Sequence, residues 1–405
     1  MRYLERTWGG ALIMPRLPAL SDRAQALKPS LTLEISARAK ELRQQGQDIC
    51  SLSAGEPDFD TPEFIVEAAQ KALGDGLTRY GPAAGDPDLR AAVAEKLTVE
   101  NGIPTKASEV LITNGGKQAI YNLFQVLLNP GDEVLIPAPY WLSYPEMARL
   151  AGASVNLIPS QADEGFRLDV DALERSIHPQ SRLLIINTPG NPTGRVMQRD
   201  ELEAVVDLLS RHPQLLVMSD EIYEFLLAEG QTHISFASLA DDLRSRCFTV
   251  NGFAKGWAMT GWRLGYLAGD EQVVKAAAAL QSQSTSNVCS FAQRGALAAL
   301  NGSRDCVRDM AASYNRRRRM LSDGLREIEG IVLEDPTGAF YAFPQLPTSI
   351  NDSMDFCRRA LEEVGLAVVP GAAFGDDRCI RLSCAVSRET IGDGLQRLRT
   401  MLHRF

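Results

Sequence analysis

Short hydrophobic runs alternate with amphipathic stretches through the middle of the chain. Several runs are hydrophobic at almost every position, which is typical of strands covered on both faces. Between them, hydrophobic residues recur at helical spacing, for example at Ile120, Leu123, Phe124 and Leu127. This alternation predicts an α/β domain with a mostly parallel sheet. The expected strands are 110–113, 133–136, 154–158, 182–187, 215–219, 247–251 and 264–268.

The last hundred or so residues have a different pattern, which predicts a smaller α+β domain. A long helix is expected over 305–328, followed by short strands that include 339–343 and 379–383. Another helix is expected to begin near Thr61, with Thr61 as its N-cap and Pro62 in its first turn. We expect residues 1–28 to form an N-terminal arm, 29–60 and 305–405 the small domain, and 61–304 the large domain.

The composition is that of an ordinary globular protein: 405 residues, 45% hydrophobic and 23% charged. No hydrophobic run reaches the roughly 18 residues of a membrane span, and the patch 11–14 is too short for a signal peptide, so a cytoplasmic location is expected. The net charge of −9 argues against nucleic acid as a partner. The seven cysteines lack a CxxC pair and the four histidines lack metal-ligand spacing, which predicts reduced thiols and no metal site.

Three polar residues lie just past the ends of predicted strands. Asn191, Asp220 and Lys255 should therefore face one crevice, because ligands bind beyond the carboxyl ends of strands in open α/β sheets. A lysine, an acid and an amide suit a pyridoxal-phosphate (PLP) site, in which the lysine forms a Schiff base and the acid keeps the pyridine nitrogen protonated. Taken singly, each also has a structural explanation: a solvated lysine, a helix cap and an Asn-Pro turn.

The segment around the lysine, NGFAKGWAMTGWRLGY (251–266), resembles the lysine motif of class I aminotransferases, which have the aspartate aminotransferase fold. The resemblance implies that Lys255 carries PLP and that Arg263, eight positions later, binds its phosphate. SDEIYE (219–224) resembles the strand end that places Asp220 at the pyridine nitrogen and Tyr223 at the ring 3′-oxygen. NTPGNPTG (187–194) resembles the motif that places Asn191 on the same oxygen, often before a cis proline.

Further segments in the family's order extend the resemblance over nearly the whole chain. TNGGKQA (113–119) resembles the phosphate loop, with Gly115 and Gly116 at a helix N-terminus. PYW (139–141) implies Trp141 over the cofactor ring, and RYGPAAG (79–85) implies Tyr80 in the phosphate site of the neighbouring subunit of a homodimer. The joint order and spacing favour this interpretation over separate structural explanations.

Two more segments imply contacts with the substrate. SAGEPDF (53–59) places the Gly55 backbone near the α-carboxylate, and IRLS (380–383) offers Arg381, whose planar fork suits a carboxylate. The sequence departs from the family pattern at Gly252 and Ala254, where many relatives have a serine near the phosphate or the lysine. The missing hydroxyl is expected to shift cofactor affinity.

The substrate class depends on a second cation. Lys117 is placed to meet the distal carboxylate of aspartate or glutamate, as in the subgroup Ib aspartate aminotransferases that this sequence resembles. KPSLT (28–32) resembles that subgroup's N-terminal motif, whose threonine, here Thr32, accompanies acceptance of prephenate. Thr32 is alternatively a helix N-cap, and Lys117 alternatively holds the phosphate. Residues 281–289 are expected to cross a dimer interface, with Asn287 lining the partner's pocket.

The expected function is PLP-dependent transamination of aspartate and glutamate with 2-oxo acids, extending to prephenate. An unperturbed lysine titrates near pH 10.4, so the site must favour the neutral amine of Lys255 as general base. The alternatives are an aromatic or alanine aminotransferase or a C–S lyase of the same fold, which have no need of a cation at Lys117. A ligand sensor would show a fused DNA-binding domain or lack the lysine, and a Rossmann dehydrogenase would show GxGxxG after a strand.

Overall fold

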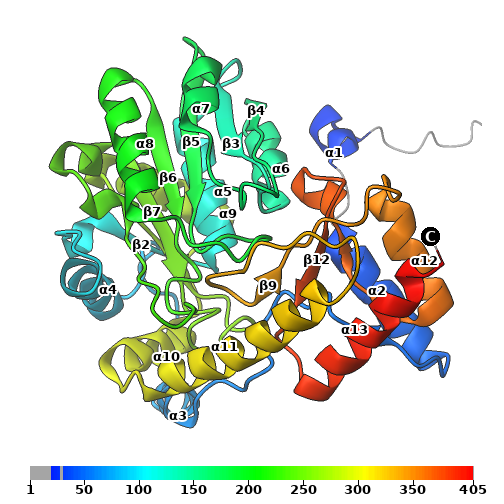
Figure 1. The fold of residues 1–405 in the computed structure, drawn as a ribbon. Helices are drawn as coiled ribbons and strands as arrows, with labels where there is room; N and C mark the ends of the chain where they lie inside the picture. The colour runs from blue at the N-terminus through cyan, green and yellow to red at the C-terminus, as the bar shows by residue number, and fades with distance from the viewer. Residues whose placement is uncertain (1–19, 28–30, 405) are drawn as a thin grey trace, which may run out of the picture.

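The larger part of the molecule is built on one seven-stranded sheet (Figure 1), seen in a computed structural model that describes residues 20–27 and 31–404. The strand order is β2-β8-β7-β6-β5-β3-β4, and β8 alone runs antiparallel to the other six strands. The predicted α/β class is confirmed, and each predicted strand is present with ends within one residue. The strands are β2 (Val110–Thr113), β3 (Glu133–Pro137), β4 (Ser154–Ile158), β5 (Ser181–Asn187), β6 (Leu216–Asp220), β7 (Cys247–Gly252) and β8 (Gly265–Ala268).

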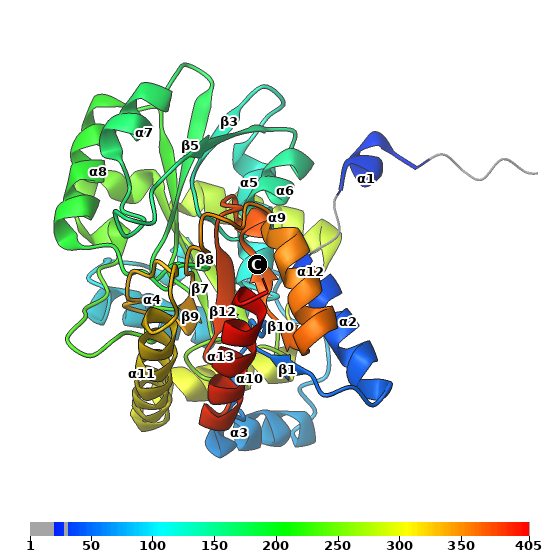
Figure 2. The same cartoon turned by 45° about the vertical axis from the view of Figure 1, so that its right-hand side comes forward.

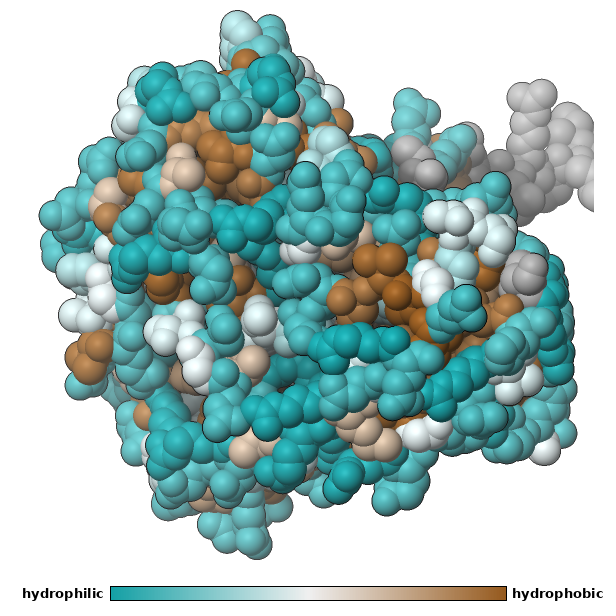
Figure 3. Space-filling view, viewed as in Figure 1, coloured by the Kyte–Doolittle hydropathy of each residue, from teal (hydrophilic) through white to brown (hydrophobic). Residues whose placement is uncertain are grey.

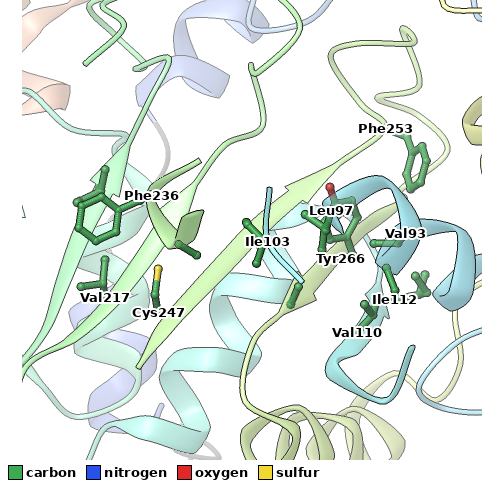
Figure 4. Close-up of a cluster of buried hydrophobic side chains, with 14 of the residues drawn as sticks. Val93, Leu97, Ile103, Val110, Ile112, Val217, Phe236, Cys247, Phe253 and Tyr266 are labelled. Atoms are coloured by element: carbon green, nitrogen blue, oxygen red, sulfur yellow. The ribbon is translucent and has the colours of Figure 1, made fainter. Parts of the chain in front are cut away.

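Helices cover both faces of this sheet, because alternate strand residues point to opposite sides. In β5, Leu183 and Ile185 pack with α5 (Gly116–Leu127), α6 (Ser143–Leu150) and α9 (Glu271–Ser284). Leu184 and Ile186 face the other side. Figure 4 shows part of that second core, in which Val110 and Ile112 lie near Val93 and Leu97. The helices there are α3 (Glu63–Gly74), α4 (Pro87–Val99), α7 (Val170–Ser176), α8 (Arg199–Arg211) and α10 (Ser290–Asn301).

The smaller part lies beside the large sheet and is formed by both ends of the described chain (Figure 2). Its strands form a parallel pair, β1-β10, and an antiparallel trio, β11-β12-β9. The predicted strands 339–343 and 379–383 are present but shorter. The elements are α1 (Asp22–Ala26), α2 (Leu31–Gln44), β1 (Cys50–Ser51), α11 (Asp305–Arg326), β9 (Tyr341–Ala342), α12 (Ser353–Val364), β10 (Leu366–Ala367), β11 (Val369–Pro370), β12 (Ile380–Ser383) and α13 (Arg388–Leu402).

The buried hydrophobic residues form separate clusters in the two parts. The clusters on the two faces of the large sheet draw their buried residues from 65–307. A third cluster joins Cys50 and Leu52 to residues 310–401, and includes Tyr223 and Leu226 from the large part. On this basis we propose the division expected from the sequence, with 61–304 as the large domain and 29–60 with 305–405 as the small one. Of the expected arm, residues 1–19 and 28 lie outside the described residues.

The predicted N-cap at Thr61 is wrong. Helix α3 begins at Glu63, and Pro62 occupies the N-cap position. The Thr61 hydroxyl instead donates to the Ala258 carbonyl at 2.7 Å and accepts the Trp262 indole N–H at 2.9 Å. Two partners nearly 200 residues away along the chain therefore outweigh the local preference of threonine for a cap.

The basic run 316–319 on α11 has mixed surroundings. Arg317 and Arg319 form ion pairs with acidic residues. Arg318, in contrast, is only 4% exposed and donates to the Ala339 carbonyl at 2.7 Å. Its buried position follows from the helical period, which turns one residue of any such run toward the neighbouring core.

The surface of the molecule and the state of its cysteines are those expected from the amino-acid composition. Hydrophilic side chains cover most of the face seen in Figure 3, and hydrophobic ones appear in separate patches. Among the described residues, no helix is both long and apolar enough to cross a membrane. All seven cysteines, which lie in this described part, are free, and five of them are buried.

Candidate active site

A cavity of about 730 Å³ lies at the carboxyl ends of β5, β6 and β7, between the large and small parts. Strand ends of an open α/β sheet are where ligands bind in such folds. The cavity brings together every residue that the sequence assigned to the cofactor or substrate of its own subunit; Tyr80, assigned to the neighbouring subunit's site, is outside it and 92% exposed. The residues it gathers are Thr32, Gly55, Gly115, Gly116, Lys117, Trp141, Asn191, Asp220, Tyr223, Lys255, Arg263 and Arg381.

Lys255 follows β7 and reaches into this cavity. Its Nζ donates to the Gly55 carbonyl at 2.6 Å and lies 5.8 Å from the centre of the Tyr223 ring. Burial lowers the pKa of Lys255 to about 8; Glu56 opposes this shift and Arg381 adds to it. The neutral amine, which is the nucleophilic and basic form of lysine, is therefore accessible near neutral pH.

Asp220 is the last residue of β6 and is 5% exposed. One carboxylate oxygen accepts the Tyr144 hydroxyl at 2.6 Å, and the other accepts the Ile222 backbone N–H at 3.3 Å. Burial raises the pKa of Asp220 to about 6, while the Tyr144 and Ile222 hydrogen bonds act in the opposite direction. A protonated ring nitrogen brought to this carboxylate would supply the positive partner that a buried carboxylate favours.

Arg381 is held at the small-domain side of the cavity by contacts to three segments. Its Nη1 donates to Asn191 Oδ1 at 3.0 Å, and its Nη2 donates to the Ser53 carbonyl at 3.0 Å. The guanidinium lies 4.4 Å from the Tyr341 ring centre, and the Tyr341 hydroxyl is 2.9 Å from that of Tyr223. The buried Arg381 Nε has no hydrogen-bond partner among the described residues. The fork is thus fixed, and each of its terminal nitrogens keeps a second N–H that a carboxylate can accept.

The N-terminus of α5 forms a cradle for an anion. Gly115 has a φ of 82°, and a Cβ there would lie 2.6 Å from Arg263 Nη2. A Cβ on Gly265 would lie 2.5 Å from the Gly116 backbone nitrogen. Arg263 itself has a left-handed φ of 56°, a strained conformation that clusters at functional sites. Backbone N–H groups, a helix N-terminus and a guanidinium meet here, as phosphate binding requires.

Lys117 and Trp141 lie together in the cavity. The Lys117 Nζ is 5.0 Å from the centre of the Trp141 ring. Burial lowers the pKa of Lys117, and the nearby Arg263 guanidinium adds to the shift. Thr32 lines the same cavity as the second residue of α2, so the alternative in which it caps that helix is wrong. Lys28, Pro29 and Ser30 of the same motif lie outside the described residues.

The two departures from the family pattern have different surroundings. A Cβ on Gly252 would lie 2.8 Å from both the Gly265 Cα and the Leu264 carbonyl oxygen, so β7 and β8 leave no room for a serine there. Ala254 lines the cavity, where its methyl group stands in place of a hydroxyl. The bond between Asn191 and Pro192 is cis, as the resemblance implied.

Sequence reasoning missed several residues of this site. Tyr144 binds Asp220, Tyr341 binds Tyr223 and packs on Arg381, and Thr260 accepts Arg263 through its carbonyl at 2.9 Å. None stood out in the sequence, because a tyrosine or threonine within a hydrophobic or loop segment carries no signal of its partner. Asn287 lies outside the cavity and donates to the Val288 carbonyl at 2.7 Å.

The sheet, with a strand-end cavity that holds a half-buried lysine, defines a transferase of the aspartate aminotransferase fold. The chain belongs to the class I and II aminotransferases, whose family model matches residues 47–398. It is 46% identical over 388 residues to the aspartate/prephenate aminotransferase of Thermus thermophilus, covering 95% of this chain and 99% of that one. It is 45% identical over 419 residues to the bifunctional aspartate aminotransferase and glutamate/aspartate-prephenate aminotransferase of Petunia hybrida, covering 99% and 87%.

Solved structures agree with this membership. The Thermus thermophilus aspartate aminotransferase with maleate matches with a TM-score of 0.90 at 45% identity, covering 95% of this chain and 100% of that chain. The aspartate aminotransferase of Rhizobium meliloti matches with a TM-score of 0.92 at 36% identity, covering 95% and 99%. The fold class and the activity class expected from the sequence, an aminotransferase, are therefore confirmed.

Membership in this family implies PLP as the cofactor, and the residues present fit it. The cradle formed by Gly115, Gly116 and Arg263 suits the phosphate, and the buried Asp220 suits a protonated ring nitrogen. The lowered pKa of Lys255 suits attachment of an aldehyde.

Proposed function

We propose that this enzyme transaminates aspartate and glutamate with 2-oxo acids, and also accepts prephenate, using PLP bound through Lys255. The observation that carries the proposal is that Arg381 and Lys117 both lie in the cavity of Lys255, in addition to Arg263, which is assigned to the phosphate. An amino acid with two carboxylates needs a cation at each end, and a neutral side chain needs only Arg381. The printed names of the relatives, and maleate, a dicarboxylate, in the Thermus structure, support the same substrate class.

The proposed cofactor contacts follow the geometry of the cavity. Lys255 would hold PLP covalently, Asp220 its ring nitrogen, and Arg263 its phosphate with the backbone of Gly115 and Gly116. Trp141 would cover the ring, which its place on the cavity wall allows. PLP supplies an electron sink that makes the substrate Cα–H bond acidic.

Two residues would hold the ring 3′-oxygen. Asn191 accepts Arg381 through its Oδ1, so its Nδ2 remains as a donor toward the cavity. Tyr223 lines the same cavity, and its hydroxyl is fixed by Tyr341. Asn191 would thereby link the substrate-binding arginine to the cofactor ring.

The residues of the chain handle the proton. The neutral Nζ of Lys255 would take the Cα proton as general base and return it later as general acid. Its lowered pKa, about 8, makes that neutral form available. Arg381 would fix the α-carboxylate near the Gly55 backbone, which keeps the Cα–H bond oriented toward Lys255.

The partner and location expectations stay predictions. Tyr80 is 92% exposed in the single chain, which suits a residue that serves the phosphate site of a second copy in a homodimer. The assignments of Asn287 to the partner's pocket and of the enzyme to the cytoplasm are predictions of the same kind. The small-molecule partners proposed are amino acids and 2-oxo acids.

Half-reactions followed by absorption test the proposal. Purified enzyme with PLP should lose the absorption of lysine-bound PLP and gain that of the pyridoxamine form on addition of aspartate. After conversion with glutamate, prephenate should restore the first spectrum. Bleaching by aromatic or aliphatic amino acids alone would instead favour an aromatic or alanine aminotransferase, and absence of a lysine-bound spectrum at saturating PLP would contradict the assignment of Lys255.

Lys117→Gln tests the distal carboxylate contact in the same assay. It should lower kcat/KM for aspartate at least about tenfold, mainly through KM, and leave alanine and phenylalanine nearly unchanged. The matched control is Lys275→Gln, because Lys275 pairs with Glu271 on the exposed side of α9. An equal loss for all substrates, with weaker PLP binding, would show that Lys117 holds the phosphate instead.

A further inference from the structure

A buried cluster of charged residues lies against the residues that wall the cavity, and the reaction above does not use it. It is formed by α4 and the loop after it, the end of β6, the end of β7 and the loop before residue 236. The members are Lys96, Asn101, Glu221, Glu224, His233, Ser235 and Asn251.

Glu224 is the centre of one half of the cluster. It forms an ion pair with Lys96, and the two side chains are only 6% and 3% exposed. The same carboxylate oxygen accepts Asn251 Nδ2 at 2.8 Å, and the other oxygen accepts Asn101 Nδ2 at 2.9 Å. A charge buried this deeply depends on its partners, because removal of one leaves the other unpaired in a medium of low polarity.

Glu221 is the centre of the other half. One oxygen accepts His233 Nε2 at 3.0 Å and the Ser235 hydroxyl at 2.7 Å; the other accepts the Ser219 hydroxyl at 2.8 Å and the Phe236 backbone N–H at 3.2 Å. Burial disfavours the charged imidazole, but Glu221 outweighs it and raises the pKa of His233. With His233 protonated, two cations balance two carboxylates.

The cluster is not arranged as a metal site. Ligand atoms of Glu221, Glu224 and His233 lie within 4.8 Å of one another. However, Glu224 already accepts three N–H donors and Glu221 four N–H or O–H donors, and the Lys96 ammonium sits among them. A divalent cation would have to displace these donors and lie against a positive charge, so the hydrogen-bonded arrangement is favoured.

The cluster is joined to the active site through one short segment, 220–224, whose side chains divide between the two. Asp220 and Tyr223 line the cavity, whereas Glu221 and Glu224 point away from it into the cluster. The cluster also holds the next strand, since Asn251 binds Glu224 and its Oδ1 accepts the Gly252 backbone N–H at 2.7 Å. Gly252 is the last residue of β7, three positions before Lys255.

We propose that the Lys96–Glu224 pair, through Asn251, is a positioning element that sets the placement of Asp220 and Tyr223 relative to Lys255. The groups lie at the ends of β6 and β7. On the side away from the cavity, the Asn251–Glu224 hydrogen bond of the cluster connects these two strand ends. This inference rests on the proposed use of Lys255, Asp220 and Tyr223, but part of its test is independent of PLP.

The test compares Lys96→Met, Glu224→Gln and the double variant with wild-type enzyme. Each single variant leaves one buried charge unpaired and should weaken PLP binding at least about tenfold. It should also move the pH midpoint of Lys255 acylation in the PLP-free enzyme, mapped by mass spectrometry, by at least about half a unit. The double variant removes both charges together and should recover most of both effects.

The matched control is the exposed pair Lys71 and Asp75 on α3, whose side chains are 75% and 62% exposed. Lys71→Met and Asp75→Asn should leave PLP affinity and the Lys255 midpoint unchanged. If Lys96→Met fails to fold, Glu224→Gln, which keeps the side-chain shape, and the double variant provide the comparison.

Two results would overturn the inference. One is a lower melting temperature in the single variants with PLP affinity and the Lys255 midpoint at wild-type values, which would make the cluster purely structural. The other is a double variant as impaired as the worse single variant. Failure of the wild-type enzyme to bind PLP would be a different result, because it would contradict the proposed function. In that case the pH midpoint of Lys255 acylation, compared between the variants and the wild type, would still test the positioning role of the cluster.

Discussion

Asp220 illustrates how a residue suited to the cofactor destabilises the protein without it. Its pKa is raised from 3.8 to about 6 by burial, so the folded protein binds this proton more tightly than the unfolded chain does. The contribution of protonated Asp220 to the free energy of unfolding is largest below about pH 4. It is lost as the pH rises through about 6. Above neutrality, the PLP-free protein carries a buried Asp220 carboxylate whose burial is only partly offset by Tyr144, Ile222 and the charge of Lys255.

Asp220→Asn is therefore predicted to stabilise the PLP-free protein. The shift corresponds to about 3 kcal/mol at pH 7.5, and the advantage should shrink toward pH 4. Denaturant unfolding at several pH values measures it. The same variant should bind PLP more weakly, because a neutral amide cannot pair with a protonated ring nitrogen. A variant less stable than wild type at every pH would contradict this account of the Asp220 environment.

At the scale of one element, the N-terminus of α5 depends on the absence of a side chain at Gly115. The positive φ of this residue favours glycine, and a Cβ would meet the guanidinium of Arg263 at 2.6 Å. The loop, the helix and the arginine thus fit together only with a bare backbone at this point. Because Gly115 and the Arg263 guanidinium lie so close together, backbone N–H groups and the guanidinium can bind the same anion.

Gly115→Ala should weaken binding of PLP, and of inorganic phosphate to the PLP-free enzyme, at least about tenfold, because the methyl group displaces Arg263 and strains the turn. Titration calorimetry measures both ligands. Gly74→Ala is the matched control, since Gly74 ends α3 and a Cβ added to it would meet no atom within 4 Å. Equal phosphate affinity in Gly115→Ala and wild type would contradict the proposed cradle.

At the scale of the whole molecule, the exposed Tyr80 predicts a shared active site. Hybrid dimers of Lys255→Ala with Tyr80→Ala, each subunit separately tagged, should contain one complete site if Tyr80 serves the partner. Such hybrids should regain about half of the wild-type activity, because a symmetric dimer has two equivalent sites. If Tyr80 served its own subunit, neither site would be complete and the hybrid would stay as inactive as its parents.

The sequence by itself determined the α/β class and the seven strands of the large sheet. This was possible because strands buried on both faces must be hydrophobic at consecutive positions, a requirement that each short segment shows on its own. The sequence also predicted that one cavity would hold Asn191, Asp220 and Lys255, because the carboxyl ends of parallel strands lie at the same edge of a sheet. The finer roles rested on the ordered motifs of the aminotransferases, which no single residue could supply.

Only the tertiary structure decided the partners that tune these groups. Tyr144 lies 76 residues from Asp220, Tyr341 lies 118 from Tyr223, and Lys96 lies 128 from Glu224. Local patterns record whether a side chain is buried, but they do not record which distant group it meets. The same reason explains Thr61, whose side chain is typical of a helix cap but is held instead by two partners about 200 residues away along the chain.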